Sequence, residues 1–323
     1  FELPDGMIAF SIGDVAGHGF QAAIVMNQVR HTMRAAALRD QNPFSVLASA
    51  NRVVFSQHQP MVTTLFGVLD PLSLNFTFST AGHLPPLLVT EEGEVRSLPC
   101  DGMPLGIVEE LEGAVSSAEL SPGGALVLYT DGIIEDLHDP ISGERALHDA
   151  LRTWAKNGFA SRAADIQANL RIGAHNDDAA MFILSFPHVD EFKIRLPATS
   201  YNAQRMRLAA RRFIAGSPFD AQRAHDAMLA VGEAVNNAIE HPYGGGHGSV
   251  TLALKRETQR LIIEVRDEGT WRESRSLDRG RGLGIMQLIA DKVDIRKSET
   301  GTTVHIEMAY VPALEPAAVA STA

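Results

Sequence analysis

Carboxylates stand at the ends of apolar strand patterns in three distant parts of the sequence. Asp14 ends the alternating run 7–14, Asp131 lies just beyond the apolar run 125–129, and Asp177 and Asp178 directly precede the apolar run 179–186. Because side chains alternate between strand faces, Asp14 is expected to share a face with Ile8, Phe10 and Ile12, and Asp131 with Ala125, Val127 and Tyr129. Burying a lone ionised carboxylate is expensive, so such groups are paired or bind a metal ion.

Three acidic strand ends that converge in one cleft would offer oxygen ligands only, which suits hard cations such as Mg²⁺ or Mn²⁺. Two such ions about 3.5–4 Å apart activate a water molecule and clamp a phosphoryl group. The sequence has no His-x-x-x-His or Cys-x-x-Cys pattern that would indicate zinc. For each Asp taken alone, a capped turn is the plainer interpretation.

A second set of polar residues lies in the C-terminal part of the sequence. Glu233 and Asn237 are one helical turn apart on the polar side of a helix expected over 221–241. There, Asn offers an oxygen to Mg²⁺ and Glu can accept a proton from an attacking hydroxyl, although a solvated helix face is the common fate of both. Asp267 ends the apolar face of a strand expected over 261–267, where it can accept a hydrogen bond from an exocyclic amine such as that of adenine.

Glycine-rich segments accompany both sets. Gly17 and Gly19 allow a tight turn and close approach to a ligand, between the first strand and a helix expected over 21–38. The segment 279–285, Arg-Gly-Arg-Gly-Leu-Gly-Ile, opens a short helix expected over 283–290, so its backbone N–H groups can face phosphates. It matches neither a Rossmann unit nor a P-loop.

Composition limits the class of protein. The 323 residues suggest two domains, and 45% apolar residues are enough for ordinary cores. A net charge of −11 makes nucleic acid an unsuitable partner. The single cysteine, Cys100, allows no internal disulfide and suits a reducing cytoplasm, and no apolar run is long enough to span a membrane. The chain opens on Phe1 almost directly into a strand, so we expect a fragment of a longer protein.

Periodicity predicts an α+β protein with antiparallel sheets. The expected N-terminal strands are 62–70, 72–80, 87–89, 115–120, 125–129 and 181–186, and the expected helices are 42–57, 145–156 and 161–172. After a junction at Pro187-His188, the pattern restarts with a strand over 191–196, helices over 202–214 and 221–241, strands over 249–256 and 261–267, and a hairpin over 293–308. We therefore expect domains at 1–187 and 190–310, and a disordered tail at 311–323.

The N-terminal motifs resemble a known family. Five motifs are similar to those of the SpoIIE/RsbU-type branch of the metal-dependent PPM phosphatases. They are Gly-Asp-Val-Ala-Gly-His-Gly-Phe from Gly13, Ser-Thr-Ala-Gly-His-Leu-Pro-Pro from Ser79, Met-Pro-Leu-Gly from Met103, Tyr-Thr-Asp-Gly from Tyr129 and Asn-Asp-Asp-Ala-Ala from Asn176. The resemblance implies a β-sandwich flanked by helices that hydrolyses phosphoserine or phosphothreonine with two Mn²⁺ or Mg²⁺ ions.

The same resemblance assigns roles to residues. It implies that Asp14 bridges both metal ions with help from the Val15 carbonyl, that Asp131 and Asp177 complete the site beside Asp178, and that His18 and His83 are structural. The family also has an acidic motif on an upstream strand. This sequence begins after that point, and Asp5 lies in a turn.

The C-terminal set resembles the GHKL (Bergerat) ATP-binding fold, closest to serine kinase anti-sigma factors of the RsbW/SpoIIAB type. The resemblance implies ATP with Mg²⁺ at Asn237, adenine at Asp267 and Gly269, and phosphates under the lid Gly280, Gly282 and Gly284. It also implies a contribution from Thr302 and a general-base role for Glu233. The second glycine of the usual Asp-x-Gly-x-Gly box is Trp271 here.

Together the two resemblances imply a partner switch. The kinase-like half would phosphorylate a STAS-type anti-sigma-factor antagonist or bind a sigma factor, and the phosphatase half would remove the phosphate. Homodimers occur among such kinases. Two alternatives stay open: an ATP-binding module that sequesters a sigma factor beside an inactive phosphatase, and a sensor-kinase-type regulator. The latter lacks a phosphoacceptor His in a suitable helix, since His225 reads as a surface residue.

Overall fold

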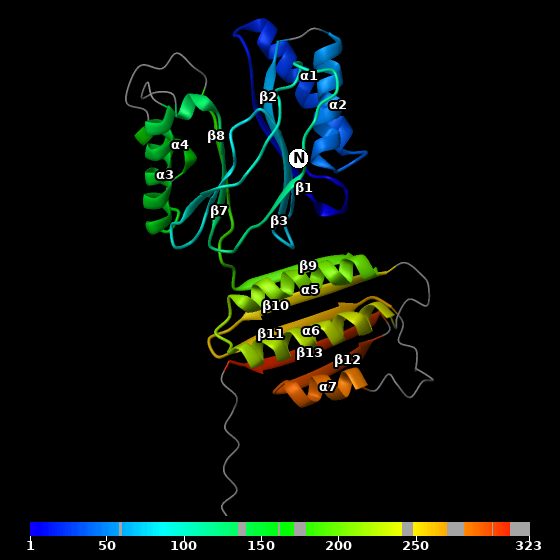
Figure 1. Cartoon of the computed structure of the whole chain (residues 1–323). Coiled ribbons are helices and arrows are strands. Elements are labelled where there is room, and N and C mark those ends of the chain that lie inside the picture. The colour runs from blue at the N-terminus through cyan, green and yellow to red at the C-terminus, as the bar shows by residue number, and fades with distance from the viewer. Residues whose placement is uncertain are drawn as a thin grey trace, which may run out of the picture. The chain divides into compact units, whose positions relative to one another are not determined.

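Two units make up the chain, Phe1–Pro187 and His188–Ala323. The computed structural model describes residues 1–57, 60–134, 140–160, 162–170, 179–240, 248–269, 281–298 and 300–310 (Figure 1). No helix in these ranges combines the length and the apolar character needed to cross a membrane.

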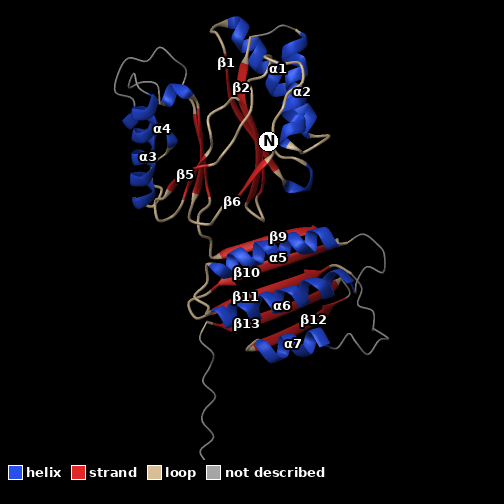
Figure 2. Ribbon diagram, in the orientation of Figure 1, coloured by secondary structure: helices blue, strands red, loops and turns tan. Residues whose placement is uncertain are grey.

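The first unit is a sandwich of two antiparallel sheets (Figure 2). One sheet has the order β1-β2-β3-β6, from β1 (Ile8–Val15), β2 (Val62–Asp70), β3 (Asn75–Ala81) and β6 (Ser116–Glu119). The other has the order β5-β4-β7-β8, from β4 (Leu87–Val89), β5 (Val95–Ser97), β7 (Ala125–Tyr129) and β8 (Met181–Ser185). Short 3₁₀ turns occur at Pro4–Gly6 and Asp131–Ile133.

Three apolar cores hold this sandwich together. Between the sheets, Phe10 stacks on Phe76 at a centroid distance of 5.4 Å, and Leu126 packs in the same cluster. The outer face of the first sheet packs against α1 (Phe20–Ala37) and α2 (Pro43–Ser56), and that of the second against α3 (Pro140–Lys156) and α4 (Ala163–Leu170). Both sheets are thus buried on two faces, which is why β7 is apolar at every position.

The second unit is a two-layer α/β sandwich. Its antiparallel sheet has the order β12-β13-β11-β10-β9, from β9 (Glu191–Pro197), β10 (Ser249–Arg256), β11 (Arg260–Asp267), β12 (Lys292–Ser298) and β13 (Gly301–Ala309). Helices α5 (Ser200–Ala215), α6 (Ala221–Glu240) and α7 (Arg281–Ile289) cover one face, and alternate residues of each strand join their core.

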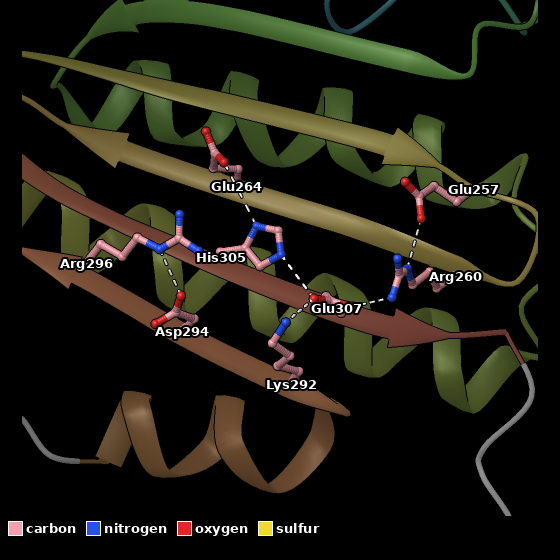
Figure 3. Close-up of polar contacts among 8 residues, drawn as sticks. All are labelled: Glu257, Arg260, Glu264, Lys292, Asp294, Arg296, His305 and Glu307. Carbon is pink, nitrogen blue, oxygen red and sulfur yellow. Dashed lines mark hydrogen bonds and ion pairs between the residues drawn. The ribbon is translucent and has the colours of Figure 1, made fainter.

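The opposite face of this sheet carries ion pairs instead of an apolar core (Figure 3). At its centre, the Glu307 carboxylate accepts hydrogen bonds from Arg260 Nη1 and Lys292 Nζ, each at 2.6 Å. His305 lies between two carboxylates, 3.3 Å from Glu307 and 3.9 Å from Glu264. The hydrogen bond from Lys292 holds the pKa of Glu307 below its usual range.

The α+β prediction with antiparallel sheets is confirmed. Strands β4, β7 and β10 have the predicted bounds, and the predicted hairpin over 62–80 forms as β2 and β3. Asn42 caps α2 by accepting a hydrogen bond from the Ser45 N–H at 3.1 Å, so the helix begins one residue later than predicted. The short strand β5 was not predicted.

Candidate functional site

The first candidate site begins where β1 ends. Asp14 is the penultimate residue of β1, is half-buried, and stands opposite Thr63 of β2. Its expected face is confirmed for Phe10 and Ile12, which contribute to the core between the sheets, whereas Ile8 at 36% exposure lies outside that core. The chain therefore brings a carboxylate to the end of a buried apolar row.

Glycines shape the backbone around Asp14. A Cβ on Gly13 would lie 2.5 Å from the Thr63 carbonyl oxygen, so only glycine fits opposite β2. Gly17 and Gly19 have φ angles of 111° and 81°, in the region that favours glycine. Gly19 then caps α1, where its carbonyl accepts a hydrogen bond from the Ala23 N–H at 3.2 Å. The exposed His18 sits between these glycines, at the surface of the turn.

A chain of pairings brings the Asp131 segment to the same end of the sandwich. Thr64, which pairs with Gly13, forms a parallel bridge to Gly82. The next residue, His83, is buried, and its Nδ1 lies 3.1 Å from the Leu84 carbonyl oxygen. Burial lowers the pKa of His83, while the bond to Leu84 and the charge of Asp131 act in the opposite direction. Asp131 is thus within electrostatic range of His83.

The structure corrects the expected orientation of Asp131. Residue 131 does not share a strand face with Tyr129, because β7 ends at Tyr129 and Asp131 opens the 3₁₀ turn Asp131–Ile133. There, Asp131 Oδ1 accepts a hydrogen bond from the Gly132 N–H at 3.0 Å. The half-buried carboxylate is therefore held by a turn and not by strand alternation.

Thr130 joins this turn to the segment that precedes β8. Its Oγ1 accepts a hydrogen bond from the Ala180 N–H at 2.9 Å, and its N–H donates to the Ala180 carbonyl at 3.0 Å. Asp177 and Asp178 lie outside the described residues. Among the side chains that the structure does describe, no three His, Cys, Asp or Glu form a metal-binding group. The described part of the predicted metal site in this unit is therefore Asp14, Asp131 and Val15, which is buried at the end of β1.

The second candidate site is centred on Asp267, the last residue of β11. The predicted apolar row beneath it is confirmed, since Leu261, Ile263 and Val265 are all buried in the core. Asp267 itself is buried, and its Oδ1 accepts hydrogen bonds from the Gly269 N–H at 3.0 Å and the Thr302 N–H at 3.2 Å. Burial raises the pKa of Asp267, and these hydrogen bonds oppose the shift.

Two helices bring the remaining residues together. Glu233 and Asn237 are half-buried on α6, which packs on β11. A Cβ on Gly282, the second residue of α7, would lie 2.6 Å from Glu233 Oε2 and 3.5 Å from Asn237 Nδ2. The backbone of α7 therefore lies close to the two polar side chains that the sequence singled out, and a side chain at position 282 would fit only if the Glu233 carboxylate moved.

The other predicted residues of this site have mixed positions. Thr302 is buried beside Asp267, and Gly284 is exposed with open space around it. Gly280, Trp271 and Arg279 lie outside the described residues, as does the predicted tail 311–323. His225 is exposed on α6, as expected of a surface residue.

Sequence reasoning missed two residues that support these sites. Thr130 was not singled out, although its place between a buried strand and Asp131 was a usable signal. Arg223 was also missed, and its hydrogen bonds to the backbone carbonyls of Ile289 and Ala309 leave no mark in the sequence.

Family models match both units. The model described as stage II sporulation protein E (SpoIIE) matches residues 4–187, and the model described as histidine kinase-like ATPase domain matches residues 196–308.

Two curated relatives match different shares of the chain. Phosphoserine phosphatase RsbP of Bacillus subtilis is 25% identical over 193 residues, which cover 57% of this chain and 47% of RsbP. Anti-sigma F factor of Bacillus licheniformis is 32% identical over 132 residues, which cover 36% of this chain and 90% of that protein. The chain thus spans about half the length of RsbP.

One solved structure resembles the whole chain. The RsbU and RsbW domains of Rv1364c from Mycobacterium tuberculosis are 27% identical, with a TM-score of 0.51, and the match covers 95% of this chain and 88% of that one.

Proposed function

Because this chain belongs to the SpoIIE family and joins its SpoIIE-type phosphatase domain to a histidine kinase-like ATPase domain of the anti-sigma F factor kind, we propose that it is a partner-switching regulator with two opposed activities. The N-terminal domain would hydrolyse phosphoserine or phosphothreonine on a protein. The C-terminal domain would bind ATP and phosphorylate serine on the same protein.

For the phosphatase half, the donor set suits a divalent cation. Asp14 lies at the end of β1 beside the glycine turn of Gly17 and Gly19, and Asp131 opens the turn after β7. In the proposal, Asp14, the Val15 carbonyl, Asp131 and Asp177 hold two Mn²⁺ or Mg²⁺ ions. These ions would supply Lewis-acid activation of water and neutralise phosphoryl charge. Thr130 would keep the Asp131 turn in register with the segment before β8.

For the kinase half, the crowding at Gly282 supports a nucleotide site. A glycine pressed against Glu233 and Asn237 is suited to close backbone approach to phosphates. Asn237 would hold Mg²⁺ with ATP, Asp267 and Gly269 would receive adenine beside Thr302, and Gly280, Gly282 and Gly284 would lie over the phosphates. Glu233 would accept the proton of the attacking serine hydroxyl.

We assign the protein substrate to the STAS-type antagonists of anti-sigma factors, with a sigma factor as the second partner. A phosphoserine adds about −1.5 to −2 charges at neutral pH, enough to break a docking surface between two proteins. Opposed kinase and phosphatase domains on one chain would then set which partner the antagonist binds. The observation that carries this proposal is that one solved structure, of the RsbU and RsbW domains of Rv1364c, matches 95% of this chain.

The first test is Mn²⁺-dependent hydrolysis of an aryl phosphate by the full chain. Asp131→Asn should remove most of this activity, since it weakens the proposed metal site. Asp149→Asn is the matched control, because Asp149 is an exposed carboxylate on α3 that pairs with Arg152 at 2.8 Å. Equal activity in the two variants would contradict the assignment of Asp131.

A second candidate function comes from the anti-sigma F factor relative, whose name describes action against a sigma factor and names no phosphotransfer. If this second function is correct, the ATPase-like domain binds a sigma factor and phosphorylates no protein. Glu233→Gln separates the two, because it should abolish phosphotransfer to a STAS-domain acceptor and leave sigma-factor binding intact. A wild-type chain that binds ATP but transfers no phosphate would favour sequestration.

A further inference from the structure

Helix α7 is poorly suited to stand on its own. It has 9 residues, and two of its first four are Gly282 and Gly284. Short helices are marginal in water, and each glycine disfavours helix by up to about 1 kcal/mol relative to alanine. Met286, at 1% exposure, and the partly buried Leu283 and Ile289 pack α7 against the core. Contacts at its two ends add to this packing and set where each end lies.

The C-terminal end of α7 is held by Arg223, which lies in the first turn of α6. Arg223 Nη1 donates to the carbonyl of Ile289, the last residue of α7, at 2.6 Å. Nε donates to the Ala309 carbonyl at the end of β13 at 3.1 Å, and Nη2 pairs with the Asp291 carboxylate. Asp291 in turn accepts a hydrogen bond from the Ala309 N–H at 2.6 Å. A single guanidinium thus joins α6, α7 and β13.

This contact also has suitable electrostatics. The last carbonyls of a helix carry partial negative charge and lack intrahelical partners, so a cation there is stabilising. The Arg223 side chain is only 11% exposed, which limits screening by solvent. Its planar fork reaches two carbonyls and a carboxylate at once, a geometry that lysine cannot reproduce.

The other end of α7 lies at the candidate nucleotide site. Gly282 is pressed against Glu233 and Asn237, ten or more residues along α6 from Arg223. Helices α6 and α7 are therefore joined at one end by Arg223 and meet at the other end where the glycine backbone faces the polar pair. At 1.5 Å per residue, α7 spans only about 10 Å between Gly282 and Ile289.

We propose that Arg223 is a positioning residue for nucleotide binding: by fastening the end of α7 to α6 and β13, it keeps the glycine backbone at the other end of α7 against Glu233 and Asn237. The proposal rests on the ATP binding proposed above. Arg223 itself touches no nucleotide. Without it, α7 would fray from its C-terminal end and the glycines would move away from the polar pair.

A second buried arginine in the same unit supplies a matched control. Arg256 is 13% exposed and donates to the carbonyls of Phe213 at 2.8 Å and Val189 at 3.0 Å, and to Ser217 Oγ at 3.2 Å. These contacts join β10 to the end of α5 and to Val189, and none of those among the described residues involves α7. Loss of either guanidinium removes a similar number of hydrogen bonds.

The test compares Arg223→Gln, Arg223→Lys and Arg256→Gln in the full chain. We measure thermal unfolding, the Kd for a fluorescent ATP analogue, and hydrogen exchange of the α7 amides without nucleotide. Both glutamine variants should lower the melting temperature. Only Arg223→Gln should speed exchange in α7 and weaken nucleotide binding, by about tenfold, the scale of losing a hydrogen bond to a charged group. Arg223→Lys should recover part of this affinity, because it keeps the charge.

The outcomes separate the proposal from the function on which it rests. A wild-type chain that binds no ATP analogue would refute the proposed nucleotide site, and exchange in α7 would still report on the anchor. Equal Kd values for Arg223→Gln and Arg256→Gln would overturn the positioning role. If Arg223→Gln does not fold, Asp291→Asn repeats the comparison in a milder form, since it removes only the charged partner of the guanidinium and should weaken binding less.

Discussion

Replacing Gly282 by alanine offers a sharp test of the contact between α7 and α6. The new Cβ would lie 2.6 Å from Glu233 Oε2, against about 3.4 Å for an ordinary van der Waals contact. The glutamate carboxylate is the free end of a flexible side chain, so it can move by the missing distance of about 0.8 Å. Asn237 Nδ2, at 3.5 Å, need not move.

Stability and catalysis should therefore respond in opposite ways. Alanine is favoured over glycine in a helix by up to about 1 kcal/mol, so Gly282→Ala should leave the melting temperature unchanged or raise it slightly. A general base displaced by about 1 Å can cost about 100-fold in rate. We expect kcat for phosphotransfer to fall by about 10- to 100-fold, with a small change in KM for ATP.

The matched control is Gly284→Ala, two residues further along the same helix. A Cβ on Gly284 meets nothing within 4 Å, so this variant gains the same helix preference without touching Glu233. The assay is phosphotransfer from ATP to a STAS-domain acceptor, with ADP formation as a second readout. Equal kcat values for the two alanine variants would refute the placement of Glu233 as a base held by α7.

Three further outcomes follow from the described contacts. Gly301→Ala should destabilise the second unit by several kcal/mol, since its Cβ would lie 1.9 Å from the Asp267 carbonyl oxygen at a φ of 142°, and a melting temperature within a few degrees of wild type would contradict this. Burial lowers the pKa of His83 below its ordinary 6.5, so the unfolded chain takes up the proton first as pH falls. The wild-type free energy of unfolding should therefore decline as pH falls through and below about 6.5, and this slope should flatten in His83→Asn, as urea titrations across pH will show. Thr130→Val should cost about 1–3 kcal/mol by leaving the Ala180 N–H without its side-chain acceptor, whereas Thr130→Ser should keep most of the stability in the same measurement.

The sequence predicts most of the fold because the strands alternate or are apolar throughout. Strands β4, β7 and β10 match their predicted bounds, because the apolar residues of each strand, which were visible in the sequence, pack in an apolar core. Strand β5 covers only Val95–Ser97 and has no buried residue, so no pattern marks it. The predicted orientation of Asp131 was wrong for a related reason. Side chains alternate between the faces of a sheet only while the strand continues, and the chain turns at residue 131.

The candidate sites were predictable as sets of residues but not as contacts. Glu233 and Gly282 both stand out in the sequence, yet their contact joins segments far apart in the chain and needs the packing of α7 on α6. Arg223 could not be found in this way. Two of its three partners are backbone carbonyls, and these exist at every residue whatever the side chain.

The pairing of β8 with β7 also sets the order in which the first unit can be completed during synthesis. Strand β8 begins at Met181, whereas β7 ends at Tyr129. At about 5–20 residues per second, the ribosome needs roughly 3–10 seconds to make the intervening segment. During that interval β7 has β4 on one side and an open edge on the other, and Ala180 has not yet reached Thr130. A nascent chain therefore exposes an apolar strand edge before the second sheet of the first unit is complete, and a chain that stops short of residue 181 would keep that edge as a site of aggregation.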